Sequence, residues 1–361
     1  MDPLRTVDDV IRQLGPSPAG FAPIPAPVYD RERGNSSGIG LAVESMRRHT
    51  TDEGFQLFIG LESAGYYLHG YGFPDKQTDV ASIVAGCSPG AVVLQDKREW
   101  LGLTAGGPRR FDNRETFTNV EALAKRLDIF KLTILKDSHN KPEFHRQSAK
   151  EIGCHAWVVY YHPRIVSHLA PYVRLEHLVR TYHSLDSEIV PPFRGGKLGC
   201  VLSGSVSNAY PLRMRLFAEC AEIPSCKVIR HPGYHAKGCD TPQYLYKLSK
   251  FKVAICTSSR FGYALRKIVE AIACGCTVVT DLPSDEVLPH IDTGLVRVPS
   301  TISTKELATV VSNLYETWDP DRAYYLSKLA KQWYDYRAVG KRLVDDIEKL
   351  RMSYPSAVQG V

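Results

Sequence analysis

The stretch SSRFGYALRKIVEAIACGCTVVTDLP, residues 258–283, decides how this chain of 361 residues folds. The apolar run FKVAIC (251–256) ends just before it, and CTVVTDL (276–282) near its end is also typical of a buried strand. Between these runs, apolar residues recur with helical spacing over 263–274, and Gly275 follows as the glycine that ends the helix. A strand, a helix and a second strand in this order predict one unit of a parallel sheet.

The same alternation runs outward from this unit in both directions. Buried strands are predicted at 91–95, 130–135, 155–161, 198–202, 226–231 and 294–298, with helices between them. A glycine-rich turn over 35–40 is expected to lead into a helix from residue 41, and helical periodicity fills most of 306–351. Near-continuous apolar strands separated by helices indicate parallel sheets covered on both faces. We therefore predict an α/β fold of two Rossmann-like domains facing across a cleft, with a helical C-terminal segment.

Composition shifts along the chain suggest four segments. A lead-in rich in proline occupies 1–30, and prolines and glycines at 190–197 are typical of an interdomain linker. We expect an N-terminal acceptor domain over 31–190 and a C-terminal domain over 191–320. The last segment, 321–361, is expected to form helices that pack back across the domains.

The composition is that of an ordinary soluble globular protein, with 43% hydrophobic and 23% charged residues. No apolar run approaches the roughly 18–20 residues of a membrane-spanning helix, and the acidic N-terminal stretch lacks the apolar core of a secretory signal. Nine cysteines without paired spacing favour reduced thiols. These features predict a cytoplasmic protein with no membrane span.

The charge balance favours an anionic partner. There are 45 basic and 39 acidic residues, so the formal net charge is +6. This excess fits a nucleotide phosphate as well as a nucleic acid. No basic run reaches five or six residues, so the sequence contains no tail of the kind that grips DNA or an anionic membrane.

Ligands of open parallel sheets bind at the carboxyl ends of the strands, so the loops that follow the strands are the places to look for chemistry. In the deciding stretch, the loop residues Ser259 and Arg260 lead into a helix whose first N–H groups can bind an anion. Arg266 and Glu270 are four residues apart on that helix and share one face. They form either a solvated ion pair or part of a ligand site.

The order E-A-x-A-C-G-C followed by V-V-T-D resembles the donor-binding domain of glycosyltransferases with the GT-B fold. Over 198–298 the layout resembles the glycosyltransferase-like domain of the spore-maturation-protein group in particular. The resemblance implies that Glu270 holds hydroxyls of the donor's ribose. Retaining enzymes of this fold carry a first glutamate eight residues earlier, where this chain has Gly262, so we carry over no retaining mechanism.

Two more positions bear on the donor. The turn Ser203-Gly204-Ser205 follows a strand, and it is either a plain turn or a loop that presents N–H groups to a diphosphate. Arg213 and Lys267 either neutralise the leaving diphosphate or have simple surface roles. The predicted donor-binding residues are therefore Gly204, Ser205, Arg213, Ser259, Arg260, Arg266, Lys267 and Glu270.

The base that deprotonates an acceptor hydroxyl is expected in the N-terminal domain. His139 follows a predicted strand and stands two residues after Asp137, and a histidine beside a carboxylate suits this role. The alternative is a turn in which Asp137 caps the next helix and His139 packs. Asp96, after another strand, is a second candidate base or else a capping or ion-paired residue.

No metal site is predicted. We expect no Asp-x-Asp to hold a divalent ion against a diphosphate, and Pro232 and Gly233 break the helix that His231 and His235 would need to share a metal. The first hypothesis is thus a metal-independent glycosyltransferase that uses a nucleotide-sugar as co-substrate, has no other cofactor, and acts on an unidentified acceptor hydroxyl. The alternatives are a non-catalytic protein that binds a nucleotide-sugar or glycan, and a glycosyltransferase that acts on a hydroxylated DNA base.

Overall fold

The computed structural model describes residues 38–41, 53–69, 77–87, 89–95, 117–135, 142–163, 177–230 and 241–354. The chain divides into two compact units. The C-terminal unit is His183–Asp335, and the described part of the N-terminal unit consists of residues up to Tyr182 together with 336–354. The boundary thus falls eight residues before the expected one at 190.

The N-terminal unit contains a six-stranded sheet in the order β2-β1-β3-β4-β5-β6. All of its neighbouring strands are parallel. The strands are β1 (Gly38–Leu41), β2 (Tyr67–His69), β3 (Ala91–Leu94), β4 (Phe130–Leu135), β5 (Ala156–Val159) and β6 (Leu178–Arg180). The helices between them are α2 (Glu53–Ser63), α3 (Val80–Cys87), the 3₁₀ helix η4 (Val120–Lys125) and α5 (Pro142–Ile152).

Strand β1 corrects the prediction of a glycine-rich turn and a helix that starts at residue 41. Residues 38–41 pair with β2 on one side and with β3 on the other. Both edges of this short segment are therefore hydrogen-bonded by neighbours that are distant in sequence. This tertiary pairing outweighs the local turn preference of the glycines.

The last helix, α11 (Tyr336–Ser353), belongs to the N-terminal unit, where it packs on α2. The two helices approach most closely at Gly60 and Gly340. A Cβ atom added to Gly60 would lie 2.3 Å from the carbonyl oxygen of Tyr336. The preceding helices α9 (Thr304–Glu316) and α10 (Pro320–Trp333) belong to the C-terminal unit, so the predicted segment 321–361 is shared between the two units.

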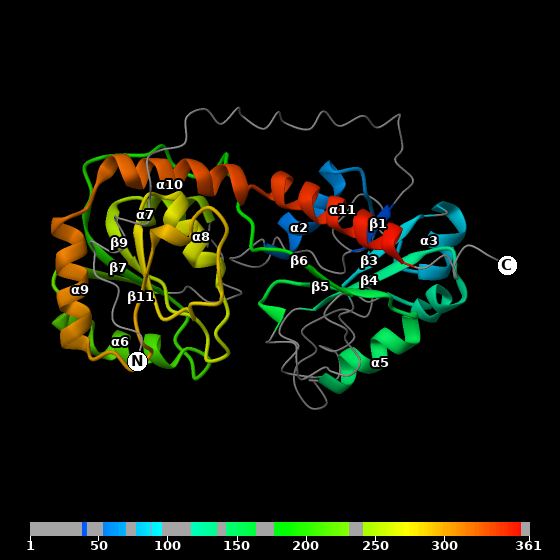
Figure 1. Cartoon of the computed structure of the whole chain (residues 1–361), viewed down its shortest axis with the longest axis horizontal. Coiled ribbons are helices and arrows are strands. Elements are labelled where there is room, and N and C mark those ends of the chain that lie inside the picture. The colour runs from blue at the N-terminus through cyan, green and yellow to red at the C-terminus, as the bar shows by residue number, and fades with distance from the viewer. Residues whose placement is uncertain are drawn as a thin grey trace. The chain divides into compact units, whose positions relative to one another are not determined.

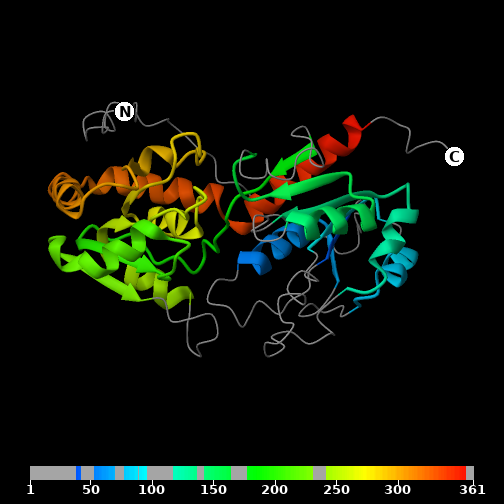
Figure 2. The ribbon, with the colours of Figure 1, turned by 90° about the horizontal axis from the view of Figure 1, so that it is seen from below.

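The C-terminal unit contains a five-stranded sheet in the order β11-β10-β9-β7-β8, again with parallel neighbours throughout. Its strands are β7 (Leu198–Gly204), β8 (Cys226–Arg230), β9 (Phe251–Ile255), β10 (Thr277–Thr280) and β11 (Leu295–Arg297). Helices α6 (Pro211–Glu219), α7 (Thr241–Leu248) and α8 (Arg266–Ala273) connect them. Figures 1 and 2 show helices on both faces of this sheet. The prediction of two parallel α/β sheets is confirmed.

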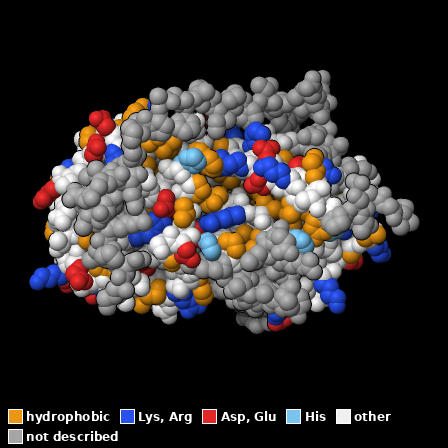
Figure 3. Space-filling view, in the orientation of Figure 1, with side chains coloured by type: hydrophobic (Ala, Val, Ile, Leu, Met, Phe, Trp, Pro, Cys, Tyr) orange, Lys and Arg blue, Asp and Glu red, His pale blue; other side chains and the backbone are white. Residues whose placement is uncertain are grey.

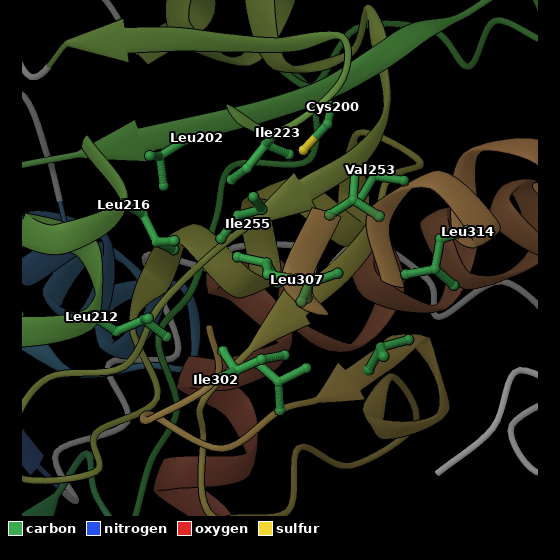
Figure 4. Packing of buried hydrophobic residues seen from close by; sticks show 14 residues of the cluster. Cys200, Leu202, Leu212, Leu216, Ile223, Val253, Ile255, Ile302, Leu307 and Leu314 are labelled. Carbon is green, nitrogen blue, oxygen red and sulfur yellow. The ribbon is translucent and has the colours of Figure 1, made fainter. Parts of the chain in front are cut away.

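The core of the C-terminal unit explains why the sheet is covered in this way. Alternate residues of the strands, such as Cys200 and Leu202 of β7, point to the face that α6 and α9 cover (Figure 4). Leu216 and Leu307 come from those two helices and are fully buried there. On the opposite face, α7 contacts β9 and α8 contacts β10.

The strand order fixes where a ligand site is expected in the C-terminal unit. Counted from the first strand of this unit, the order is 2-1-3-4-5, so consecutive strands change direction across the sheet between β7 and β9. Open parallel sheets bind ligands at the carboxyl ends of the strands at such a switch point. The loops that follow β7 and β9 are therefore the place to look.

Two smaller expectations concern cysteines and membranes. Seven cysteines between Cys154 and Cys276 are free thiols, in line with the prediction. None of the helices that the structure describes combines the length and the apolar character needed to cross a bilayer.

Candidate functional site

The end of β7 is shaped by a glycine and an arginine. Gly204 is the last residue of the strand and has φ +127°, a backbone conformation that residues with a side chain rarely adopt. A Cβ atom at this position would lie 2.6 Å from Nη1 of Arg213. Ser203 and Gly204 thus belong to the strand and not to a tight turn, and the glycine makes room for the guanidinium of Arg213.

Arg213 lies in α6 and joins the loop after β7 to the loop after β9. Its Nη1 donates to the carbonyl oxygen of Ser205 at 3.1 Å. Its Nε donates to Oγ1 of Thr257 at 3.0 Å, and its Nη2 donates to the carbonyl oxygen of Thr257 at 3.0 Å. The side chain is 1% exposed and lies over the ring of Tyr210, with Cζ 4.1 Å from the ring centroid. This burial excludes the surface role, which is one of the two roles that the sequence left open for Arg213.

Two backbone N–H groups of the loop after β9 hold this loop to its neighbours on either side. The backbone N–H of Arg260 donates to the carbonyl oxygen of Ala209 at 2.8 Å. The N–H of Ser258 donates to Oδ1 of Asp281 at 2.6 Å, which ties the loop after β9 to the end of β10. Burial raises the pKa of Asp281, and the hydrogen bond from Ser258 opposes that shift. Three neighbouring strand ends are thus held together.

The loop after β9 also delays the start of helix α8. Oγ of Ser259 accepts from the N–H groups of Phe261 and Tyr263, at 3.2 and 3.5 Å. Gly262 has a positive φ of 73°, and Leu265 is the N-cap in an extended conformation. The helix therefore begins at Arg266, three residues later than the sequence predicts, because side-chain hydrogen bonds stabilise a turn in its place.

Helix α8 carries a buried ion pair. Nε of Arg266 lies 2.9 Å from Oε1 of Glu270, and both side chains are 5% exposed. This rules out the solvated ion pair that the sequence left open. Nη1 and Nη2 of Arg266 are buried and have no hydrogen-bond acceptor among the residues that the structure describes, and Nε is paired with Oε1 by charge without forming a hydrogen bond to it. A buried guanidinium with unused donors is costly unless a ligand supplies the acceptors.

Lys267 is the second cation of α8 and is half-buried. Its Nζ lies 4.8 Å from the ring centroid of Tyr244 in α7, and Oη of Tyr244 shares a 2.9 Å hydrogen bond with Oγ of Ser203. Burial lowers the pKa of Lys267, an effect that the nearby charge of Arg213 reinforces and Glu270 opposes. Lys267 makes no ion pair or hydrogen bond through Nζ with any described residue.

These contacts place the predicted donor-binding residues in one connected group. They lie at the ends of β7 and β9 and on the first turns of α6 and α8: Gly204, Ser205, Arg213, Ser259, Arg260, Arg266, Lys267 and Glu270. The group holds more cations than carboxylates in a partly buried setting, which suits an anionic ligand.

Sequence reasoning missed three residues of this group. Thr257 and Asp281 are polar residues that follow β9 and β10 at the same edge of the sheet, so strand-end position was the signal available for both. Tyr244 lies inside a helix and gives no such signal, because only the packing of α7 brings it to Ser203.

The residues predicted to act as a base, Asp96, Asp137 and His139, lie outside the described residues. The same holds for His231, His235 and Cys239. Of the strands that precede the candidate bases, β4 ends at Leu135 as the sequence predicts, and β3 ends at Leu94, one residue earlier than predicted.

No group of histidine, cysteine, aspartate or glutamate suited to a metal ion occurs among the described residues. The chain does contain one Asp-x-Asp sequence, Asp319-Pro320-Asp321, which corrects the expectation of none. Asp319 is the N-cap of α10, and its Oδ1 accepts from the N–H groups of Asp321 and Arg322. This motif caps a helix.

No protein-family model matches the sequence, and no curated protein matches it significantly. Several solved structures are similar to this chain in fold. A sucrose-phosphate synthase from Thermosynechococcus elongatus has a TM-score of 0.55 at 12% identity, over 88% of this chain and 100% of its own. A glycosyltransferase from Rickettsia africae has 0.53 at 10% identity, over 88% and 100%.

A third structure, Anabaena HepE in complex with UDP-glucose, has a TM-score of 0.51 at 11% identity, over 87% of this chain and 99% of its own. These matches span nearly the whole length of each chain, and their sequence identities are low. At such identities the likeness concerns the fold. The chain has the two-domain α/β fold of GT-B-type glycosyltransferases, as its sequence predicts.

Proposed function

We propose that this protein is a glycosyltransferase that takes a sugar from a nucleotide-sugar and transfers it to an acceptor hydroxyl. The observation that carries the proposal is the buried Arg266 with unused donors, beside Lys267 and Glu270, at the switch point of the C-terminal sheet. The fold shared with glycosyltransferases of known structure supports the same function.

The residues fit the chemistry of the donor. When a sugar leaves a nucleotide-sugar, negative charge develops on the diphosphate, and fixed cations in a partly buried site stabilise it. We assign this role to Arg266 and Lys267. Glu270 pairs with Arg266 through Oε1, and we assign its other oxygen, Oε2, to hydroxyls of the donor's ribose.

The acceptor side of the reaction rests on the sequence. We propose His139, with Asp137 beside it, as the base that takes the proton of the acceptor hydroxyl, and Asp96 as its competitor. Since Gly262 stands where retaining enzymes of this fold carry a glutamate, we assign no retaining mechanism. We propose further that the reaction needs no metal ion.

Two other functions remain as outcomes of the test. A binding protein of the same fold would hold the nucleotide-sugar without turning it over. An enzyme acting on DNA would show strongly salt-dependent binding to a basic surface. On the face drawn in Figure 3, basic and acidic side chains are interspersed, which favours a small anionic ligand over a polyanion.

The test is a thermal-shift screen of UDP-, GDP-, ADP- and TDP-linked sugars, followed by calorimetry and an assay of donor hydrolysis. UDP-glucose comes first, because HepE was solved with UDP-glucose bound. A ligand that binds the folded state raises the unfolding temperature by an amount that grows with the logarithm of its concentration relative to its dissociation constant. We expect at least one donor to do so and to be hydrolysed. Binding without hydrolysis, even with candidate acceptors, would indicate a binding protein, and binding of no nucleotide-sugar would overturn the proposal.

A further inference from the structure

The contacts of Arg213 differ from those of a residue that binds a ligand. Its three named hydrogen bonds go to Ser205 and Thr257, in loops that follow two different strands. The side chain is 1% exposed, and Tyr210 covers one face of the guanidinium. Three of the five N–H groups of this guanidinium are bound to the two loops, and its burial separates it from solvent.

We propose that Arg213 is a positioning residue: it locks the loops after β7 and β9 into one cradle and thereby sets the affinity for the donor's phosphates without touching them. This inference rests on the proposed function, and it refines the role that the sequence suggests for Arg213. The geometry that carries it is the bridge from the carbonyl oxygen of Ser205 to both oxygen atoms of Thr257.

The local sequence supports this bridge. Gly204 must be a glycine both for its φ of +127° and because a Cβ atom would lie 2.6 Å from Nη1 of Arg213. Pro211 begins α6 at its first turn, so the helix that carries Arg213 starts at a fixed point after the loop. A second link, from the N–H of Arg260 to the carbonyl oxygen of Ala209, joins the same two loops.

The chemistry of the guanidinium explains why arginine is needed. Its planar fork can donate to both loops at once, whereas a lysine ammonium is a point charge on a flexible stem and cannot span the same acceptors. Burial lowers the pKa of Arg213, and the acceptors around it are carbonyl and hydroxyl oxygens. The cation therefore has a geometric function in addition to its charge.

The experiment compares Arg213→Lys with Arg213→Gln, using UDP-glucose for binding and amide hydrogen exchange without any ligand. If Arg213 is a positioning residue, both variants weaken UDP-glucose binding by about 10- to 100-fold, the size of effect that a small displacement of a binding group produces. Exchange then accelerates in both loops together, at 205–210 and at 257–262, before ligand is added.

Arg215→Lys is the matched control. Arg215 lies on the same helix and also donates to a backbone carbonyl, that of Ile302, but its contacts are with the start of α9 and not with the two loops. This variant should leave exchange in the two loops and UDP-glucose affinity unchanged. Thr257→Val removes one acceptor of the bridge and keeps the side-chain shape, so it tests the same link if the Arg213 variants do not fold.

The outcomes separate this inference from the proposed function. If Arg213→Lys binds UDP-glucose as tightly as the wild-type protein and Arg213→Gln does not, the charge of residue 213 sets the affinity and the bridge does not. The inference is then overturned. Unchanged exchange in Arg213→Gln or in Thr257→Val also overturns it. If wild-type protein binds no nucleotide-sugar while exchange still accelerates in both loops, the lock exists and the proposed function fails.

Discussion

Nε of Arg266 lies 2.9 Å from Oε1 of Glu270 inside helix α8, where each side chain is 5% exposed. Exposed i,i+4 pairs stabilise a helix only slightly, but a buried pair is different, because each charge depends on its partner for compensation. The remaining N–H groups of Arg266 have no acceptor among the described residues. Among the described residues the hydrogen bonding of Arg266 is thus incomplete, and we propose that a donor phosphate completes it.

The first prediction concerns Glu270. Glu270→Ala leaves Arg266 buried and uncompensated, so we expect the free energy of unfolding to fall by about 3–5 kcal/mol, measured by urea denaturation. Glu270→Gln keeps the shape and an acceptor, and should cost less. At temperatures where both variants are folded, UDP-glucose binding should weaken by about 1–3 kcal/mol in each.

Arg266→Met/Glu270→Leu is the control for this pair. Replacing both partners by apolar residues of similar size removes both buried charges, so the double variant should regain most of the lost stability. It should not regain affinity. Wild-type UDP-glucose affinity in a folded Glu270→Gln protein would contradict the role we assign to Glu270.

The second prediction is the pH dependence of Lys267. Because burial lowers its pKa from the ordinary 10.5, the charged form is disfavoured in the folded state. Below the pKa that Lys267 has in the folded protein, its buried charge lowers the free energy of unfolding. As the pH rises from that pKa to 10.5, this destabilisation disappears. Affinity for UDP should fall over the same rise, because the cation that attracts the phosphates is lost.

Lys267→Met should weaken UDP binding by about 10- to 100-fold, the equivalent of a lost hydrogen bond to a charged group, and leave the free energy of unfolding unchanged or higher. Lys267→Arg should bind with a flatter pH profile in isothermal calorimetry, since arginine stays charged. Lys331→Met, at another half-buried lysine with a pKa lowered by burial, is the control and should not change binding. Equal losses in both methionine variants would mean that Lys267 has no special role.

The third prediction is that Asp281→Asn is tolerated. Burial raises the pKa of Asp281 above 3.8, so its ionised form is disfavoured in the folded state. This cost is fully present above the folded pKa and absent below 3.8. Asparagine keeps an oxygen that accepts from the N–H of Ser258, so stability at pH 7 should stay the same or rise, and the difference should vanish as the pH falls through that window.

Asp281→Asn should also bind UDP somewhat more tightly, because a negative charge near the proposed phosphate site is removed. Asp292→Asn is a useful contrast: Asp292 is paired with Arg297 at 2.7 Å, so this variant should lower the unfolding temperature. A large loss of stability in Asp281→Asn at pH 7 would show that the carboxylate charge itself is needed.

The fourth prediction is that donor hydrolysis survives EDTA. We expect equal rates with and without the chelator, measured on protein dialysed against EDTA. Asp319→Ala should lower stability by about 1 kcal/mol through the lost helix cap and leave the response to EDTA unchanged. Activity that is lost in EDTA and restored by manganese or magnesium would contradict metal independence.

The fifth prediction concerns the base. His139→Ala should reduce turnover by about 10²–10⁴-fold, the usual contribution of general base catalysis. Donor affinity should not change, because the proposed donor site lies in the C-terminal unit. Asp96→Asn is the competing variant. If it abolishes turnover while His139→Ala stays near normal, the base is Asp96.

The sequence alone determined the class of the fold and predicted a donor site in the C-terminal unit. Apolar residues that recur every 3.6 positions specify helices, and continuous apolar runs specify buried strands. Helices and strands that alternate along the chain form a parallel sheet. The strand FKVAI and the end of the helix before Gly275 were predictable, because each depends on neighbours in sequence. Gly65, which follows α2, has a positive φ of 102°, which is typical of a glycine that ends a helix.

Tertiary structure decided what depends on distant partners. Residues 38–41 are a strand because β2 and β3 flank them, and α11 belongs to the N-terminal unit because Gly340 meets Gly60. No local pattern tells whether Arg266 and Glu270 face solvent or the interior, since an i,i+4 spacing suits both. Likewise, the guanidinium of Arg213 joins two loops because the sheet places β7 beside β9. The distances between these hydrogen-bonding groups depend on the tertiary structure, and the spacing of the residues along the chain does not specify them.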